Sequence, residues 1–194
     1  MDYLVAPEAI DTPAFTIRSD QPGDGALLQE AVNNSYEHLR TYTAWASPHQ
    51  SLDESESVCR RARGRYLLAQ DFTLGIFSPA GDRLLGGTGF HLRGEELALG
   101  NAEIGMWIRA DAAGQGLGTA ALVTMLGWGF DAWPWLRLEW HCDATNRASA
   151  RAAQKAGMHQ EAHLRRDMLA ANSPERRDTL IFGALRGEWS PPAD

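Results

Sequence analysis

Apolar residues recur along the chain with two different periods. Between residues 24 and 39 they fall at the spacing of one helix face, which predicts an α-helix there (Leu27, Leu28, Ala31 and Val32). Between residues 136 and 142 every second residue is apolar, the pattern of a half-buried strand (Leu136, Leu138, Trp140 and Cys142). The chain is therefore expected to contain both helices and strands.

Turn and capping residues divide the rest of the chain. Ser51 is followed three residues later by Glu54, a capping-box signature, so a helix is expected over 52–65. Two more helices are predicted over 119–132 and over 148–156, the second closed by Gly157. Strands are predicted over 14–18, 72–78, 84–92, 102–109, 162–169 and 179–186. Strands first, then helices interleaved with strands, indicate an α/β (α+β) fold around one sheet.

The composition is that of a globular domain. The chain has 194 residues, of which 44% are hydrophobic and 22% charged, so one domain is expected. We assign residues 1–13 to an irregular N-terminal arm, 14–189 to the domain and 190–194 to a tail. No apolar run approaches the ~20 residues of a membrane span, and the first residues lack a signal-peptide pattern. We therefore expect a cytoplasmic protein without membrane association.

Charge, cysteines and histidines narrow the range of partners. The net charge of −7 at pH 7 argues against nucleic-acid binding and is compatible with a cationic substrate such as an amine. Cys59 and Cys142 cannot form a disulfide framework. The histidines are scattered without the spacing of a ligand set, so no metal site is expected.

A glycine-rich segment between a predicted strand and a predicted helix carries the sharpest chemical signal. Residues 113–119 read Ala-Gly-Gln-Gly-Leu-Gly-Thr. The glycines bring backbone amides close to a ligand and the helix N-terminus adds unpaired N–H groups, which together favour a phosphate or pyrophosphate. The segment lacks the Lys-Ser/Thr pair of an NTP-binding loop and the glycine spacing of a dinucleotide fold. On the glycines alone, a turn without a ligand is the alternative.

Motifs on both sides of this segment narrow its ligand further. Residues 102–108 read Ala-Glu-Ile-Gly-Met-Trp-Ile, and downstream follow Asn146-Arg147-Ala148-Ser149, Ala156-Gly157-Met158 and, over 161–165, Glu-Ala-His-Leu-Arg. In order and spacing these motifs resemble the GCN5-related N-acetyltransferases, in particular the branch that acetylates ribosomal-protein N-termini. The resemblance covers about 14–189. It implies a single-domain acyl-CoA N-acyltransferase fold, with a mixed twisted sheet of six to seven strands and helices on both faces.

The resemblance also implies acetyl-CoA as the cosubstrate. The family's pyrophosphate loop, Gln/Arg-x-x-Gly-x-Gly/Ala, maps onto residues 113–118, where Ala113 departs from the pattern. The preceding strand is implied to splay from the strand at 136–142, so that the pantetheine arm pairs with its edge like an added strand. The cofactor-binding residues implied in this way are Met106, Trp107, Ile108, Gly114, Gln115, Gly116, Leu117, Gly118, Thr119 and Asn146.

Two catalytic residues are implied for the chemistry, in which an uncharged amine attacks the thioester carbonyl and the thiolate of coenzyme A leaves. Ser149 matches a serine proposed in the ribosomal-protein branch to assist the leaving sulfur. Glu103 is our first candidate for the base, with His141 and Asp167 as alternatives. The tyrosine that many relatives use as the acid is missing, because no tyrosine follows Tyr66. Positioning alone also accelerates such a reaction, so a dedicated base is not required.

The expected function is therefore transfer of an acetyl group to an amine. The first candidate for the acceptor is the α-amine of a protein or peptide, and a small-molecule amine such as an antibiotic, polyamine or amino acid is the alternative. Trp45 is expected to line the acceptor pocket. A non-catalytic acyl-CoA-binding module and a nucleotide-binding protein are the rivals from other classes. A homodimer is compatible with the resemblance, because many relatives pair.

Overall fold

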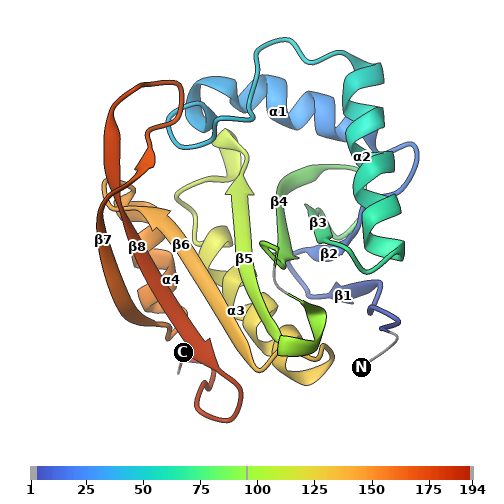
Figure 1. The fold of residues 1–194 in the computed structure, drawn as a ribbon. Coiled ribbons are helices and arrows are strands. Elements are labelled where there is room, and N and C mark those ends of the chain that lie inside the picture. The colour runs from blue at the N-terminus through green and yellow to red at the C-terminus, as the bar shows by residue number, and fades with distance from the viewer. Residues whose placement is uncertain (1–3, 95, 193–194) are drawn as a thin grey trace.

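One eight-stranded sheet runs through the computed structural model, which describes residues 4–94 and 96–192 (Figure 1). The strand order is β1-β2-β3-β4-β5-β6-β8-β7, and all neighbours are antiparallel except β5 and β6, which are parallel. The strands are β1 (Ala9–Asp11), β2 (Thr16–Ser19), β3 (Phe72–Phe77), β4 (Leu84–His91), β5 (Asn101–Ile108), β6 (Arg137–Asp143), β7 (His159–Leu169) and β8 (Arg176–Leu185).

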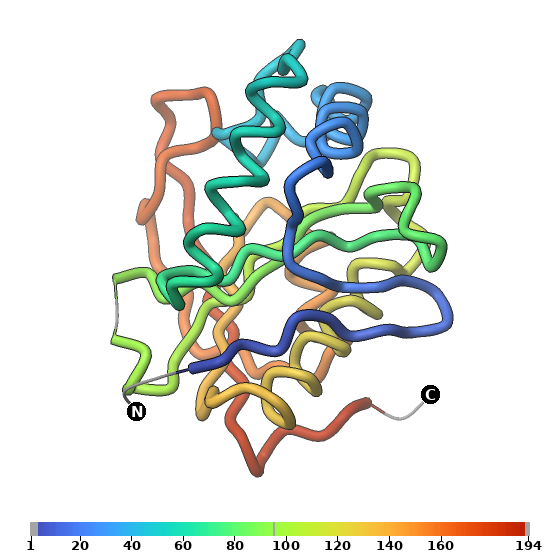
Figure 2. The backbone as a smooth tube through the Cα atoms, turned by 90° about the vertical axis from the view of Figure 1, so that its right-hand side faces the viewer, coloured from blue at the N-terminus to red at the C-terminus, as the bar shows by residue number. Residues whose placement is uncertain are grey.

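In the described ranges four helices cover the sheet from both sides: α1 (Gly25–Leu39), α2 (Leu52–Leu67), α3 (Leu117–Asp131) and α4 (Arg147–Lys155). Figure 2 shows α2 and α3 on opposite sides of the sheet. The capping box of α2 is confirmed, because the Ser51 side chain accepts from the backbone N–H of Glu54 while the Glu54 carboxylate accepts from that of Ser51. The mixed α/β fold with helices on both faces is therefore confirmed. None of the helices in these ranges has both the length and the apolar character needed to cross a membrane.

The sheet has more strands than the six to seven expected. The additional strand at the edge is β1, which pairs with β2 and lies within the arm predicted to be irregular. Its three residues are too few to show a period, and Pro7 and Pro13 on either side are turn signals. Pairing with β2, the next element of the chain, makes this segment a strand although its own residues show no pattern.

The main core lies between the sheet and α3. Strand alternation places one apolar set on this face (Phe72, Phe90, Ile104 and Leu138), each almost completely buried. These side chains pack against α3 and against the tryptophans that follow it. The rings of Trp133 and Trp135 are stacked, with centroids 5.9 Å apart and planes 13° apart. The opposite face of the central strands is therefore left for α1, α2 and the site.

β5 and β6 pair over only three residues before they separate. Their parallel register ends at Glu103↔Glu139. Beyond that point β5 is paired with β4 as far as Ile108, and β6 is paired with β8 as far as Asp143. The facing edges of the two strands therefore carry backbone N–H and C=O groups without a strand partner, in agreement with the splay that the resemblance implies.

A buried arginine holds α1 against the end of β5. The side chain of Arg109 is 3% exposed, and its guanidinium donates to both carboxylate oxygens of Glu30 on α1, at 2.8 and 2.9 Å. It also donates to Asp111 and to the carbonyl oxygen of Leu84. The hydrogen bond from Arg109 lowers the pKa of the Glu30 carboxyl, so the pair stays ionised at neutral pH. Three segments of the chain thus meet at one guanidinium.

α1 and α2 approach each other closely at the first residue of α1. A Cβ added at Gly25 would lie 2.6 Å from the Cα of Glu56 on α2. The Glu56 carboxylate accepts hydrogen bonds from the backbone N–H groups of Gly23 and Gly25. Glycine at position 25 is therefore a requirement of helix packing.

Replacement of this glycine gives a test of the helix contact. Gly25→Ala should lower the free energy of unfolding by about 1–3 kcal/mol, because the added methyl group pushes α1 away from α2. Gly64→Ala is the matched control, because it lies inside α2 with no atom within 4 Å of the added Cβ and should stabilise by about 0.5–1 kcal/mol. Urea denaturation measures both changes. Wild-type stability in Gly25→Ala would show that the two helices are not in contact there.

Candidate active site

The glycine-rich segment lies where β5 ends and α3 begins. Gly114 and Gly116 have φ angles of 76° and 88°, in the left-handed region that favours glycine. Gly116 is the N-cap of α3, and no side chain caps this helix end. The helix begins at Leu117, two residues earlier than predicted, so Leu117, Gly118 and Thr119 form its first turn. The backbone N–H groups of that turn are the donors of an anion site.

This segment offers backbone donors rather than side-chain donors. A Cβ added at Gly114 or Gly116 would meet no atom within 4 Å, so the space above the backbone is open. The side-chain amide of Gln115 is turned back and donates to the carbonyl oxygen of Asp111 at 2.9 Å. Ala113 supplies no polar side-chain atom. The geometry therefore fits a pyrophosphate group without the side chain that the family pattern places first.

The free edge of β5 leads into this segment. The side chains of Met106 and Ile108 pack toward the core on the α3 side, whereas Trp107 packs toward α1. Every second residue of an antiparallel strand directs its N–H and C=O away from its partner. Because β6 has separated from β5 here, those groups of residues 104–108 can pair with an extended ligand.

The N-terminus of α4 lies at the same end of the sheet, because β5 and β6 are parallel. Asn146 is the N-cap of α4, and its Oδ1 accepts from the backbone N–H of Ser149 at 3.1 Å. The hydroxyl oxygen of Ser149 accepts from Nε1 of Trp140 on β6 at 3.0 Å. With that oxygen used as an acceptor, the hydroxyl hydrogen of Ser149 is available to a further group.

A carboxylate fixes the turn that precedes Asn146. Asp143 accepts from the backbone N–H and the hydroxyl of Thr145, at 2.8 and 2.7 Å, and from Arg177 on β8 at 3.1 Å. Burial alone would raise the pKa of Asp143, but the hydrogen bonds from Thr145 and Arg177 hold it below its usual range. Asp143 therefore stays ionised and keeps the start of α4 in place.

Glu103 belongs to the last residue pair before β5 and β6 separate. Its carboxylate oxygens accept from Arg93 at 2.7 and 2.9 Å. Nδ1 of His141 lies 3.6 Å from Oε2 of Glu103, and Nε2 of His141 lies 2.9 Å from Oε2 of Glu139. The structure thus brings two of the predicted candidates for the base, Glu103 and His141, together on one face of the sheet.

On the face of β4 and β5 that is turned away from α3, several positions are glycine and contribute no side chain of their own. A Cβ added at Gly87 would lie 2.3 Å from Nε1 of Trp107, and one at Gly105 would lie 2.9 Å from Nε2 of His91. These glycines, with Gly89 between them, let an indole and an imidazole lie flat against the sheet. We refer to Gly87, Gly89 and Gly105 as the glycine floor.

The segment between α1 and α2 reaches over the same face. The ring of Trp45 contacts that of Trp107 edge to face, with centroids 5.8 Å apart, and Trp45 is 51% exposed. The hydroxyl of Tyr42 donates to the carbonyl oxygen of Thr145 at 3.3 Å. This segment therefore links the glycine floor to the turn before α4, and it places Trp45 where an acceptor can reach it.

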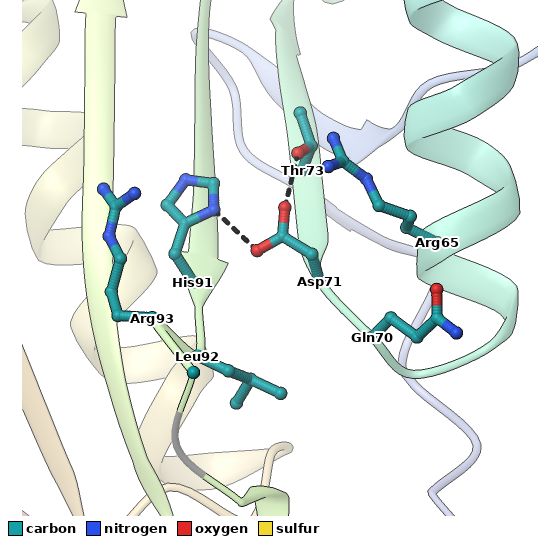
Figure 3. Close-up of a pocket in the computed structure, with 8 residues that line it drawn as sticks. Arg65, Gln70, Asp71, Thr73, His91, Leu92 and Arg93 are labelled. Carbon is teal, nitrogen blue, oxygen red and sulfur yellow. Dashed lines mark hydrogen bonds and ion pairs between the residues drawn. The ribbon is translucent and has the colours of Figure 1, made fainter.

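An open groove with a volume of about 550 Å³ is lined by His91, the residue whose ring lies against Gly89 and Gly105 (Figure 3). Arg65 of α2 lines one side and Arg93 the other, with Asp71 and His91 between them. Nδ1 of His91 lies 2.9 Å from Oδ1 of Asp71. Sequence reasoning missed this pair, because the two residues are distant along the chain and neither belongs to a motif. The one signal available was a polar residue at the edge of each predicted strand.

Asp167, the remaining candidate for the base, is not brought to this site. It lies on β7, the outermost strand, which β8 separates from β6. The structure therefore brings Glu103 and His141 together near the strand separation, sets Asn146 and Ser149 at the same end of the sheet as the glycine-rich segment, and leaves Asp167 at the sheet edge.

Comparison with known proteins agrees with this geometry. A family model described as Acetyltransferase (GNAT) domain matches residues 15–159, whereas no curated protein matches the sequence. The fold is similar to that of the RimL ribosomal L7/L12 alpha-N-protein acetyltransferase in complex with coenzyme A (17% identity, TM-score 0.82, 92% of this chain and 98% of that one). It is also similar to the microcin C7 self-immunity acetyltransferase MccE with acetyl-CoA and AMP (20% identity, TM-score 0.81, 93% and 98%). A third similar structure is the ribosomal-protein-S5-alanine acetyltransferase from Vibrio fischeri (13% identity, TM-score 0.79, 95% and 100%).

The matched residues contain every element of the site described above. They include β5, the glycine-rich segment, β6 and α4, and they make up well over half of the chain. The open amides at the start of α3 and the unpaired edge of β5 fit the two parts of acetyl-CoA that this family binds. The chain therefore belongs to the GNAT acetyltransferase domain family and is an acetyl-CoA-dependent N-acetyltransferase.

Proposed function

We propose that this enzyme acetylates the N-terminal α-amine of a protein or peptide. The observation that carries the proposal is the open groove of about 550 Å³ beside the glycine floor, which admits the end of a polypeptide without enclosing it. Small-molecule sites usually bury most of their ligand. Two of the similar structures are named as acetyltransferases of ribosomal proteins, which supports the same class of acceptor.

In this proposal acetyl-CoA lies along the free edge of β5. Its pyrophosphate accepts from the backbone amides of residues 114–119, where the positive end of the α3 dipole favours an anion. The pantetheine arm pairs with the backbone of residues 106–108. Asn146 contacts this arm through its amide nitrogen, because its Oδ1 already caps α4. The cofactor-binding set is thus Met106, Trp107, Ile108, Gly114, Gln115, Gly116, Leu117, Gly118, Thr119 and Asn146.

The two catalytic residues expected from the sequence, Ser149 and Glu103, have different roles in the reaction. Attack of the amine on the thioester forms an oxyanion, which a backbone N–H of residues 106–108 stabilises. Ser149, whose hydroxyl oxygen accepts from Trp140, directs its hydrogen to the departing sulfur. Glu103, the first candidate for the base from the sequence, contributes a negative charge that favours a cationic acceptor.

A small-molecule amine is the second candidate for the acceptor. The similar structure of MccE is named as a self-immunity acetyltransferase and contains AMP, so the fold also serves acceptors other than protein N-termini. Carboxylates near the glycine floor, Asp71 and Glu103, attract any cationic amine.

Acetyl transfer to a panel of acceptors tests the proposal. The panel holds short peptides that begin with Ser, Ala or Met, the same peptides with blocked N-termini, spermidine and free amino acids. We expect mass spectrometry to find acetylation at the α-amine of unblocked peptides and none in the blocked ones. Acetylation of spermidine or amino acids alone would replace the peptide acceptor by a small amine.

The cofactor assignment is tested at Gly116. Gly116→Asp should weaken acetyl-CoA binding at least ~100-fold, or about 2.7 kcal/mol, because a carboxylate would face the pyrophosphate. Gly116→Asn is the matched control, because asparagine has the same size, carries no charge and tolerates the left-handed conformation. Calorimetric titration with acetyl-CoA measures both. Normal affinity in Gly116→Asp would remove the pyrophosphate from this segment.

The assignment of Ser149 is tested by removal of its hydroxyl. Ser149→Ala should lower kcat at least ~10-fold while the Kd for acetyl-CoA stays within twofold, because the hydroxyl acts on the leaving sulfur rather than in binding. Ser149→Thr keeps a hydroxyl and should retain more activity. Steady-state kinetics and calorimetry separate the two effects, and an unchanged kcat in Ser149→Ala would exclude Ser149 from the reaction.

A further inference from the structure

A histidine–carboxylate pair lines the groove apart from the residues assigned above. Nδ1 of His91 lies 2.9 Å from Oδ1 of Asp71, and a carboxylate can only accept, so Nδ1 carries the hydrogen. In the neutral ring, Nε2 is then the unprotonated nitrogen. The other carboxylate oxygen of Asp71 accepts from the hydroxyl of Thr73 at 3.1 Å. Asp71 is thereby held in place and fixes both the tautomer and the direction of the imidazole.

The glycine floor determines where this nitrogen lies. A Cβ at Gly105 would lie 2.9 Å from Nε2 of His91, and one at Gly89 would lie 3.1 Å from it. Gly105 is two residues beyond Glu103, at which β5 separates from β6. Nε2 thus lies over the face of β5 at Gly105, next to the point where β6 separates from this strand. The hydrogen bonds among the described residues leave Nε2 without a partner.

The neighbouring carboxylate is less free to take up a proton. The oxygens of Glu103 already accept from Arg93, at 2.7 and 2.9 Å, and its side chain is 14% exposed. A proton on Glu103 would therefore have to displace the guanidinium. Among the residues that the structure describes, no such ion pair engages Nε2 of His91, whose side chain is 20% exposed and lines the groove (Figure 3).

We propose that His91, held by Asp71, accepts the proton that the acceptor ammonium loses before it attacks acetyl-CoA. Asp71 acts as a positioning residue in this step. The inference rests on the proposed placement of acetyl-CoA along the free edge of β5. It does not depend on whether the acceptor is a peptide or a small amine, because both approach as ammonium ions at neutral pH.

The step balances without a further reactant. The ammonium gives one proton to Nε2 of His91, and the free amine forms a C–N bond to the thioester carbonyl carbon. The C–S bond breaks, and its electron pair leaves with the sulfur of coenzyme A. The second proton of the attacking nitrogen balances the thiolate, with Ser149 able to pass it on. His91 then releases its proton to water, so one proton is produced for each amide formed.

Charged groups around His91 come from each neighbouring element. They are Asp71 before β3, Arg65 on α2, Arg93 after β4 and Glu103 on β5, with His141 of β6 beyond Glu103. Burial alone would raise the pKa of Asp71, but the hydrogen bond and charge of His91, then Thr73 and Arg65, hold it below its usual range. Asp71 therefore stays ionised at neutral pH.

Kinetics of His91→Ala test the proposal with the best acceptor of the panel. We expect kcat at pH 7 to fall at least ~100-fold and the Kd for acetyl-CoA to stay within twofold. The deficit should shrink toward pH 9.5, because more of the amine is then already unprotonated, and imidazole added to the buffer should restore part of the rate. A purely structural role would give neither response.

The chain offers a matched control in His163, whose Nε2 lies 2.7 Å from Asp178 on the outer strands of the sheet. His163→Ala removes the same kind of pair outside the site and should leave kcat unchanged. His141→Gln should keep the acidic limb of the pH profile, whereas His91→Ala should lose it. Asp71→Asn should lower kcat about 10-fold or more without response to imidazole.

Two results would overturn the proposal. One is a kcat for His91→Ala within threefold of wild type at pH 7, or a deficit that neither pH nor imidazole changes. The other needs no acceptor: nitrogen NMR of the imidazoles should show His91 protonated at Nδ1, and protonation at Nε2 instead contradicts the proposed role. Failure of every peptide in the panel, with spermidine acetylated, would remove the peptide acceptor and leave the test of His91 intact.

Discussion

The short parallel pairing of β5 and β6 is the constraint on which the rest of the site depends. Three residue pairs join the strands, and after Glu103 each is held only by its outer neighbour. If the pairing continued further, β6 would occupy the edge of β5 that an extended cofactor needs. The parallel direction also sets both strand ends, and so the glycine-rich segment and α4, at one end of the sheet.

Much of this arrangement could be predicted from the sequence, because its signals are local. The capping box at Ser51, the helix end at Gly157 and the alternation before Cys142 each report on a few consecutive residues, and the structure contains the elements they predict. The glycine-rich segment was identified in the same way. Helix α3 nevertheless begins at Leu117 rather than Thr119, because glycine gives no periodic signal at a helix start.

The features that sequence reasoning missed depend on contacts between strands rather than on the pattern within one strand. β1 becomes a strand through β2, and three residues carry no readable period. Asp71 and His91 meet because β3 and β4 are antiparallel neighbours. The turn at residues 79–82 indicates that hairpin, but it does not show which side chains at the strand ends come into contact. The glycines of β4 and β5 predict backbone freedom, whereas in the folded sheet their role is to make room for the rings of Trp107 and His91.

The guanidinium of Arg109 also makes the two halves of the site one cooperative unit. It joins Glu30 of the helix above the acceptor face, Leu84 of β4 and Asp111, which leads into the glycine-rich segment. Local opening of α1 takes Glu30 away from the buried guanidinium of Arg109. The loss of this partner costs free energy unless the segment at Asp111 opens at the same time. A ligand that orders that segment consequently also stabilises α1 against local opening. The amide hydrogens of α1 then exchange more slowly, although the ligand does not contact them.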